Sequence, residues 1–117
     1  MNLIKLTHQN FDAVIAKHDL LVIDFGAEWC APCKSFEKVI AQVAQQYPNV
    51  VFGNVDVDAE KDLAEEFNVL SVPAVMILRE RVIVFAESGA MTQTALTELI
   101  QQAQAIDPKQ LQDASCN

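Results

Sequence analysis

The chain has 117 residues, of which 51% are apolar and 21% are charged. This length suits one compact domain, and this composition excludes intrinsic disorder for most of the chain. Sixteen acidic residues against eight basic ones give a net charge of −8; this sign is wrong for neutralising phosphates, so we expect neither nucleic acid nor an anionic membrane as a partner.

The first half of the chain predicts strands that alternate with helices. The apolar positions indicate a strand over residues 3–6, a helix capped by Thr7 or Asn10, a buried strand over 20–26, a long amphipathic helix over 30–47 and a strand over 50–57. Pro48 ends the long helix, because proline cannot continue it. Such an alternation requires parallel strands joined by helical crossovers.

The second half predicts a different connection. Asp58 can cap a third helix, and residues 74–78 and 82–86 are strand-like with only Arg79-Glu80-Arg81 between them. This connection is too short for a crossover, so the two strands form an antiparallel hairpin. Thr92 can cap a last helix that carries Leu96 and Ile100. The order βαβαβαββα therefore predicts an α/β fold, with a mixed central sheet and helices on both faces.

Two cysteines lie where a strand gives way to a helix, in the segment Trp29-Cys30-Ala31-Pro32-Cys33-Lys34. Cys30 is then at or beside the helix N-cap, where unpaired N–H groups and the positive end of the helix dipole favour an anion. Pro32 suits the first turn, since its missing N–H would have no partner there. Two thiols separated by two residues can close a small disulfide, which predicts a switch between dithiol and disulfide.

The segment from Ile23 to Lys34 closely resembles the active-site segment of thioredoxins, and the resemblance extends through Val72-Pro73 and Gly89-Ala90. It covers about residues 1–106, which we take as the thioredoxin domain, and leaves residues 107–117 as a loose, polar C-terminal tail. It implies the thioredoxin fold and a protein-disulfide reductase with no cofactor of its own beyond the redox-active disulfide.

The resemblance also implies roles for individual residues. Cys30 is the attacking thiolate, Cys33 the resolving thiol, and Asp24 a buried acid that moves protons for Cys33. Pro73 is a cis-proline that faces the sulfur atoms, and Val72 offers backbone groups to an extended substrate. The positions implied to contact substrate are Trp29, Ala31, Pro32, Val72, Pro73 and Gly89.

Asp24 is also a candidate site residue on the pattern of residues alone, because it interrupts an otherwise apolar strand. A buried carboxyl group has a raised pKa, since burial disfavours the charged form, and such a group can transfer protons near neutral pH. The residues alone leave open a solvent-exposed acid on the strand.

The sequence does not favour a metal or haem site. Structural zinc needs four ligands, and the other candidates beside the cysteine pair, His8, His18 and Cys116, have no ligand spacing. Lys34 stands where a c-type haem motif requires histidine. We expect both histidines on the surface, and Cys116 as a tail thiol that is either inert or able to pair between molecules.

Four positions depart from the family pattern. Ala31 replaces the usual glycine between the cysteines, and Gly26 stands where many members have an aromatic residue, which opens space or admits water beside the site. We place Gly53 at the position of a lysine often found near the buried acid. Arg81 replaces a glycine of the final hairpin, which predicts a different turn there.

The predicted function is a monomeric reductant of disulfides in client proteins, regenerated by a flavin-dependent thioredoxin reductase that uses NADPH. The alternative is a binding or chaperone-like module of the same fold, in which electron transfer is secondary. The first residues do not resemble a secretory signal, and no apolar run approaches the length that crosses a bilayer. We therefore expect a cytoplasmic location.

Overall fold

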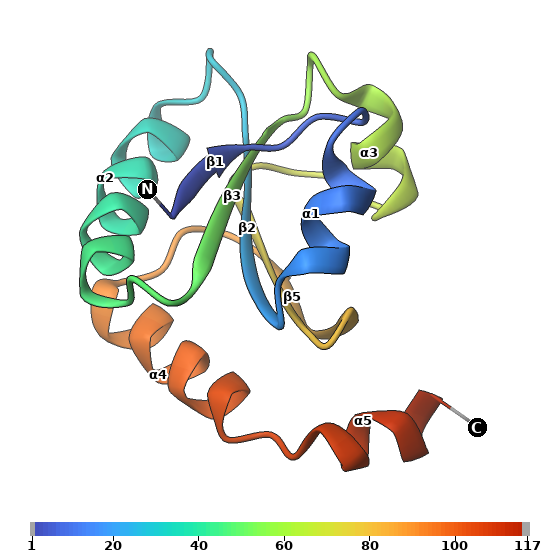
Figure 1. The fold of residues 1–117 in the computed structure, drawn as a ribbon. Helices are drawn as coiled ribbons and strands as arrows, with labels where there is room; N and C mark the ends of the chain where they lie inside the picture. Colours follow the sequence, from blue (N-terminus) through green and yellow to red (C-terminus); the bar gives the residue numbers. More distant parts are fainter. Residues whose placement is uncertain (1, 116–117) are drawn as a thin grey trace.

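The computed structural model describes residues 2–115, and their side chains as far as residue 111 (Figure 1). The expected thiol of Cys116 lies outside the described residues. The elements in chain order are β1 (Leu3–Lys5), α1 (Phe11–Lys17), β2 (Leu20–Gly26), α2 (Ala31–Gln46), β3 (Val51–Asp56), α3 (Lys61–Glu66), β4 (Ala74–Arg79), β5 (Val82–Ser88), α4 (Gln93–Gln104) and α5 (Pro108–Ser115).

The strands form one five-stranded mixed sheet in the order β1-β3-β2-β4-β5. β3 pairs in parallel with both β1 and β2, whereas β4 is antiparallel to β2 and β5. This arrangement confirms the predicted fold class. In Figure 1, α2 and α4 lie on one side of the sheet, and α1 and α3 lie on the other.

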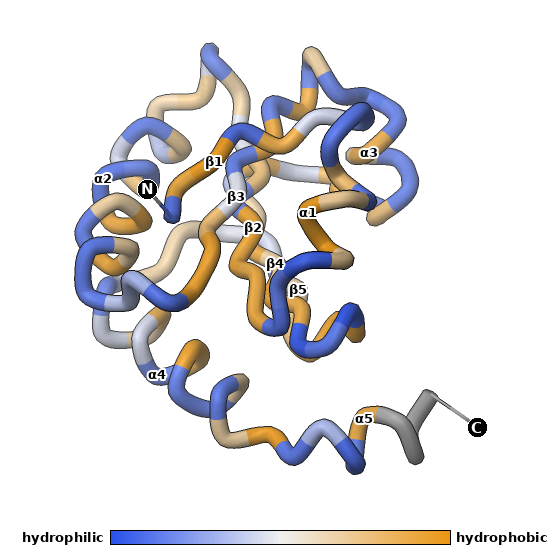
Figure 2. The backbone as a smooth tube through the Cα atoms, in the orientation of Figure 1, coloured by the Kyte–Doolittle hydropathy of each residue, from blue (hydrophilic) through white to orange (hydrophobic). Residues whose placement is uncertain are grey.

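The sheet divides the core into two apolar layers, because successive side chains of a strand point to opposite faces. On β2, Leu20 and Val22 pack with α2 and α4, while Leu21, Ile23 and Phe25 pack with α1 and α3. All seven residues of β2 are buried. Figure 2 shows the apolar colour concentrated along the central strands, with the helices alternating between apolar and polar residues. β2 is thus a rigid support for the segment that follows it, between Gly26 and α2.

The helix starts confirm one predicted cap and correct another. The Thr92 hydroxyl accepts a hydrogen bond from the amide of Ala95 at 3.1 Å, as expected of an N-cap. Asp58 is not the cap of α3, which begins three residues later at Lys61. The Asp58 carboxylate instead binds the indole of Trp29, a tertiary contact that local spacing does not reveal.

The turn between β4 and β5 also differs from expectation. Glu80 and Arg81 both have positive φ, of 52° and 70°. Positive φ at both central residues is the pattern of a type I′ turn, the form that matches the twist of a two-residue hairpin. Arg81 therefore adopts the left-handed conformation that glycine adopts more easily, rather than forcing a different turn.

The expected loose tail after residue 106 is corrected as well, since the chain forms α5 there and Leu111 is buried. Pro108 starts this helix, where its missing N–H carries no penalty. Among the described residues, no helix is long and apolar enough to span a membrane.

Candidate active site

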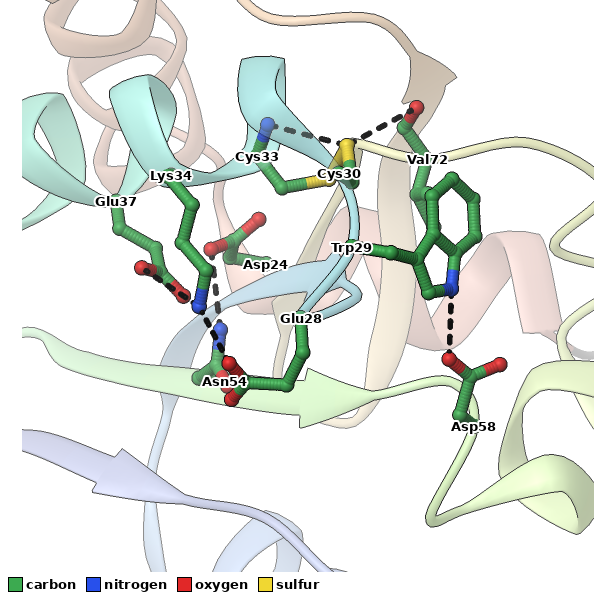
Figure 3. Close-up of a disulfide and its surroundings, with 10 residues drawn as sticks. All are labelled: Asp24, Glu28, Trp29, Cys30, Cys33, Lys34, Glu37, Asn54, Asp58 and Val72. Atoms are coloured by element: carbon green, nitrogen blue, oxygen red, sulfur yellow. Dashed lines mark hydrogen bonds and ion pairs between the residues drawn. A yellow bond between two sulfur atoms is a disulfide. The ribbon is translucent and has the colours of Figure 1, made fainter.

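Cys30 and Cys33 form a disulfide at the start of α2, with their Cα atoms 5.2 Å apart. β2 ends at Gly26, and the short connection that follows brings Cys30 to the N-cap position of the helix. Pro32 occupies the first turn, as predicted. The rigid strand and the long helix thus hold the two sulfur atoms at the junction between them (Figure 3).

The helix start favours negative charge on the Cys30 sulfur. The backbone amide of Cys33 donates to Cys30 Sγ at 3.2 Å, and the N-terminal end of α2 faces the same atom. The two cysteines differ in exposure, with 4% for Cys30 and 1% for Cys33. Both residues are therefore buried in the disulfide form, and Cys33 is the more deeply buried of the two.

A second loop lies against the disulfide. The carbonyl oxygen of Val72 lies 3.9 Å from Cys30 Sγ, and the Val72-Pro73 peptide bond is cis, which agrees with the expectation from the family resemblance. The Pro73 carbonyl accepts a hydrogen bond from the amide of Gly89 at 2.7 Å. Gly89 has a φ of 106°, a conformation that side chains disfavour, so glycine is required at this turn.

Three of the residues expected to contact substrate, Trp29, Ala31 and Pro32, are exposed. Trp29 is 72% exposed, and its indole N–H donates to Asp58 at 2.8 Å. Ala31 and Pro32 are exposed beside it on the first turn of α2. Pro73, by contrast, is buried, so its side chain supports the loop rather than offering a surface. Tryptophan and the start of α2 thus form an accessible rim around the sulfur atoms.

Asp24 is buried in β2, with 2% of its surface exposed, which settles the alternative of a solvent-exposed acid. It lies two residues before Gly26, and a Cβ added at Gly26 would meet Cys33 Cβ at 3.4 Å. Since alternate residues share one face of a strand, Asp24 is on the face of β2 that Cys33 contacts. Figure 3 shows its carboxyl group on the Cys33 side of the disulfide.

Burial raises the pKa of Asp24 from 3.8 to about 7. A hydrogen bond from Asn54 lowers the pKa, and the negative charge of Glu37 raises it. Oδ2 of Asp24 accepts from Asn54 Nδ2 at 3.2 Å, while Oδ1 has no hydrogen-bond partner among the described residues. A carboxyl group with such a pKa can exchange a proton near neutral pH.

Asn54, and not Gly53, is the residue beside the buried acid. In the parallel pairing of β2 with β3, Asp24 is opposite Asn54. A Cβ added at Gly53 would instead overlap the side chain of Leu6, on the other face of the sheet. Because successive side chains of β3 point to opposite faces of the sheet, Asn54 faces Asp24 and position 53 faces away from it. Reasoning from the sequence misses Asn54, although it is the first polar residue of an apolar strand and a register count against Asp24 finds it.

Gly26 brings the backbone of β2 against Cys33. The Cβ of another residue here would lie 3.4 Å from Cys33 Cβ and 3.6 Å from its Sγ, which are ordinary contact distances. The position therefore leaves Cys33 packed against main chain. A larger residue would have to extend past the resolving sulfur.

The two histidines lie on either side of α1 in the chain. His8 Nδ1 lies 3.0 Å from Glu60 Oε1, and His18 is at the end of α1. Within residues 2–115, no group of three or more His, Cys, Asp or Glu side chains is arranged to hold a metal ion.

Comparisons with known proteins agree with this geometry. The family model described as Thioredoxin matches residues 2–102. "Putative thioredoxin 2" of Streptomyces coelicolor is 43% identical over 111 residues, covering 95% of this chain and 83% of the relative. "Thioredoxin C-3" of Corynebacterium nephridii is 40% identical over 100 residues, covering 85% of this chain and 69% of the relative.

Solved structures show the same fold. Oxidised mitochondrial thioredoxin 3 of Saccharomyces cerevisiae superposes with a TM-score of 0.79 at 36% identity, covering 86% of this chain and 94% of the other. A mutant thioredoxin of Halobacterium salinarum superposes with a TM-score of 0.84 at 27% identity, covering 92% of this chain and 95% of the other. The similarity thus extends over nearly the whole of these chains.

Proposed function

The chain belongs to the thioredoxin family and is a thiol-disulfide oxidoreductase, and on that premise we propose that it reduces disulfides in client proteins by attack of Cys30. The observation that carries the proposal is the Cys30–Cys33 disulfide at the N-terminus of α2, in which the sulfur of the less buried residue, Cys30, accepts the amide hydrogen bond. The alternative of a binding or chaperone-like module is not favoured, because the redox pair is intact.

The reaction starts from the reduced dithiol. The Cys30 thiolate attacks one sulfur of the client disulfide, so that a Cys30–client bond forms and a client thiolate leaves. Cys33, after losing its proton, then attacks Cys30, which releases the second client thiolate and closes the Cys30–Cys33 disulfide. Two electrons pass to the client, and the short separation gives Cys33 a high effective concentration for the second step.

Asp24 is the proposed acceptor of the Cys33 proton. It is on the face of β2 that packs against Cys33, and burial holds its pKa at about 7, so that the ionised form is available at neutral pH. A base whose pKa is close to the working pH combines a sufficient ionised population with useful basicity. Asn54 fixes the carboxyl group by its hydrogen bond.

The client is proposed to lie along the rim of the disulfide. Val72 presents backbone groups beside Cys30, and an extended segment can pair with such groups whatever its sequence. Trp29, Ala31 and Pro32 offer exposed surface next to the sulfur, and Pro73 and Gly89 hold the neighbouring loop. Recognition through backbone groups suits a reductant that acts on many clients.

The proposal also covers how the dithiol is regenerated and where in the cell the protein works. A thioredoxin reductase, which carries flavin and uses NADPH, would return the disulfide to the dithiol, and the chain itself would need no metal or organic cofactor. We further propose that it works as a monomer in the cytoplasm and contributes to electron transport and redox homeostasis there. Fractionation of cells with detection of the native protein would test the location.

The test is reduction of insulin disulfides in the presence of NADPH and a thioredoxin reductase. Wild type should turn over, and Cys30→Ser should lose activity completely. Cys33→Ser should accumulate a Cys30–client mixed disulfide that mass spectrometry detects, because the resolving thiol is missing. Retained turnover in either variant would contradict the proposed roles.

A further inference from the structure

A groove of about 390 Å³ lies beside the redox site and includes Asp24 and Asn54 in its lining. It is bordered by β1, β3 and the first turns of α2. Glu28, which lies two residues before Cys30, and Glu37, one turn after Cys33, belong to its lining. Figure 3 shows these side chains on the side of the disulfide away from Val72 and Trp29.

Most of the polar side chains in the lining are acidic. Glu28, Glu37 and Asp56 contribute carboxylates, and Asp24 contributes a fourth carboxyl group from β2. Asp24 is 2% exposed, and its Oδ1 has no hydrogen-bond partner among the described residues. Asn54 uses its Nδ2 to bind Asp24, which leaves its carbonyl oxygen as a further acceptor in the lining. The groove therefore offers acceptors to a donor that enters from outside.

The resident cations do not balance these acids. Lys5 belongs to the lining, and Lys34 Nζ lies 3.0 Å from Glu28 Oε2 and 4.0 Å from Glu37 Oε2. The four acidic side chains thus face two lysines, so an excess of negative charge remains even when Asp24 is protonated. Both lysines are at least partly exposed, which lets them move aside for another cation.

The rest of the lining is apolar and comes from Leu3, Ile4 and Ile40. Long cationic side chains combine an aliphatic stem with a charged head, and they bury the stem along apolar surface while the head stays with water or acceptors. A groove with an aliphatic wall and several carboxylates matches both parts. A small inorganic cation would use only the acidic part.

We propose that this groove receives an arginine or lysine side chain of the client protein, from a position a few residues from the client's reacting cysteine. The inference rests on the proposed function and adds a preference among clients to it. The hydrogen bonds to the Val72 loop would accept many sequences, while the groove would favour disulfides with a basic residue on the Asp24 side of the site. The excess of acid in the lining is the complementary charge.

The experiment compares matched disulfide peptides in single turnover with the full-length, pre-reduced protein. Each peptide has one disulfide and either arginine or its neutral isostere citrulline, scanned over the four positions on each side of the reacting cysteine. Separation of oxidised from reduced peptide gives the second-order rate constant. At one or two neighbouring positions, we expect arginine to react roughly 3- to 10-fold faster than citrulline at low salt. The ratio should approach one in 0.5 M salt, where charges are screened within about 4 Å.

Two variants separate the groove from the overall charge of the chain. Glu28→Gln removes one carboxylate of the lining, and Glu98→Gln removes one from an exposed position on α4, so both have the same net charge. Glu28→Gln should reduce the arginine preference to less than about twofold while citrulline peptides react as before, and Glu98→Gln should keep it.

Equal rates for arginine and citrulline at every position would overturn the inference and leave the proposed function intact. An equal loss of preference in the two variants would also overturn it, because the attraction would then come from the net charge. Failure to reduce any peptide would overturn the proposed function itself.

Discussion

Asn54 donates a hydrogen bond to Asp24 across two paired strands, from Nδ2 to Oδ2 over 3.2 Å. The other residues of β2 are apolar and buried. The hydrogen-bond partner of the one carboxyl group on this strand is thus a neutral amide. Because an amide supplies no net charge, desolvation outweighs the hydrogen bond, and the pKa of Asp24 stays at about 7.

Replacing Asn54 should move this pKa in opposite directions. Asn54→Leu removes the hydrogen bond that lowers the pKa of Asp24, so the pKa should rise, and Asn54→Lys places a cation beside the carboxyl group, so it should fall. Titration of the Asp24 carboxyl carbon by NMR measures both shifts. Asn49→Leu, at an exposed position, is the control and should cause neither. Shifts of the same sign in both variants would contradict this account.

Asp24→Asn should keep the fold and slow the release of the client from the mixed disulfide. The amide cannot accept the Cys33 proton, and general base catalysis typically contributes about 10²- to 10⁴-fold, so we expect a loss of at least about tenfold near pH 7. Stopped-flow measurement of thiol release at pH 6, 7 and 8 provides the check. Rates that equal those of wild type throughout would remove Asp24 from the mechanism.

Asp24 should also make the stability of the protein depend on pH. Its pKa is about 7 in the folded state and 3.8 without burial, so between these values the folded state binds more protons, and stability falls as the pH rises from about 4 to about 7. Three pKa units correspond to a loss of at most about 4 kcal/mol, and this loss is absent below pH 4 and complete above pH 7. Urea unfolding of the oxidised protein at pH 5 and pH 8 should show a smaller difference for Asp24→Asn than for wild type. Identical pH profiles would be inconsistent with a raised pKa.

The two buried glycines of the sheet should respond differently to alanine. A Cβ at Gly53 would overlap the side chain of the fully buried Leu6, so Gly53→Ala should destabilise the protein by about 1–3 kcal/mol. Gly26→Ala is the matched control, since its Cβ would meet Cys33 only at contact distance and should cost less than about 1 kcal/mol. The free energy of unfolding in urea measures both, and a larger loss for Gly26→Ala would contradict the packing described.

Arg81→Gly should stabilise the β4–β5 hairpin. Arg81 has a φ of 70°, which is unfavourable for a residue with a side chain, and glycine removes that strain. The greater freedom of glycine in the unfolded chain offsets part of the gain, so we expect a net increase of about 0.5–1 kcal/mol. Thermal unfolding is a sufficient measurement, and Arg81→Ala, which retains the strain, should show no such gain.

The local pattern of residues is sufficient to predict most of the fold. Apolar spacing predicts β2 to its final residue and α2 to within one residue at each end, because both are long and strongly patterned. The hairpin follows from the short connection between two strands. Contacts between distant residues set the rest: Asp58 has the local pattern of a helix cap and instead binds Trp29, and the tail beyond residue 106 forms α5.

The cysteine spacing already indicates the chemistry, since two cysteines with two residues between them at a helix start favour a switch between dithiol and disulfide. The surroundings of that switch depend on how distant segments pack together. Burial is a property of the assembled sheet, and strand register is a relationship between segments 30 residues apart. For that reason the size of the shift in the pKa of Asp24, the choice of Asn54 over Gly53 as its neighbour, and the acidic groove beside them became visible only when β1, β2, β3 and α2 were packed together.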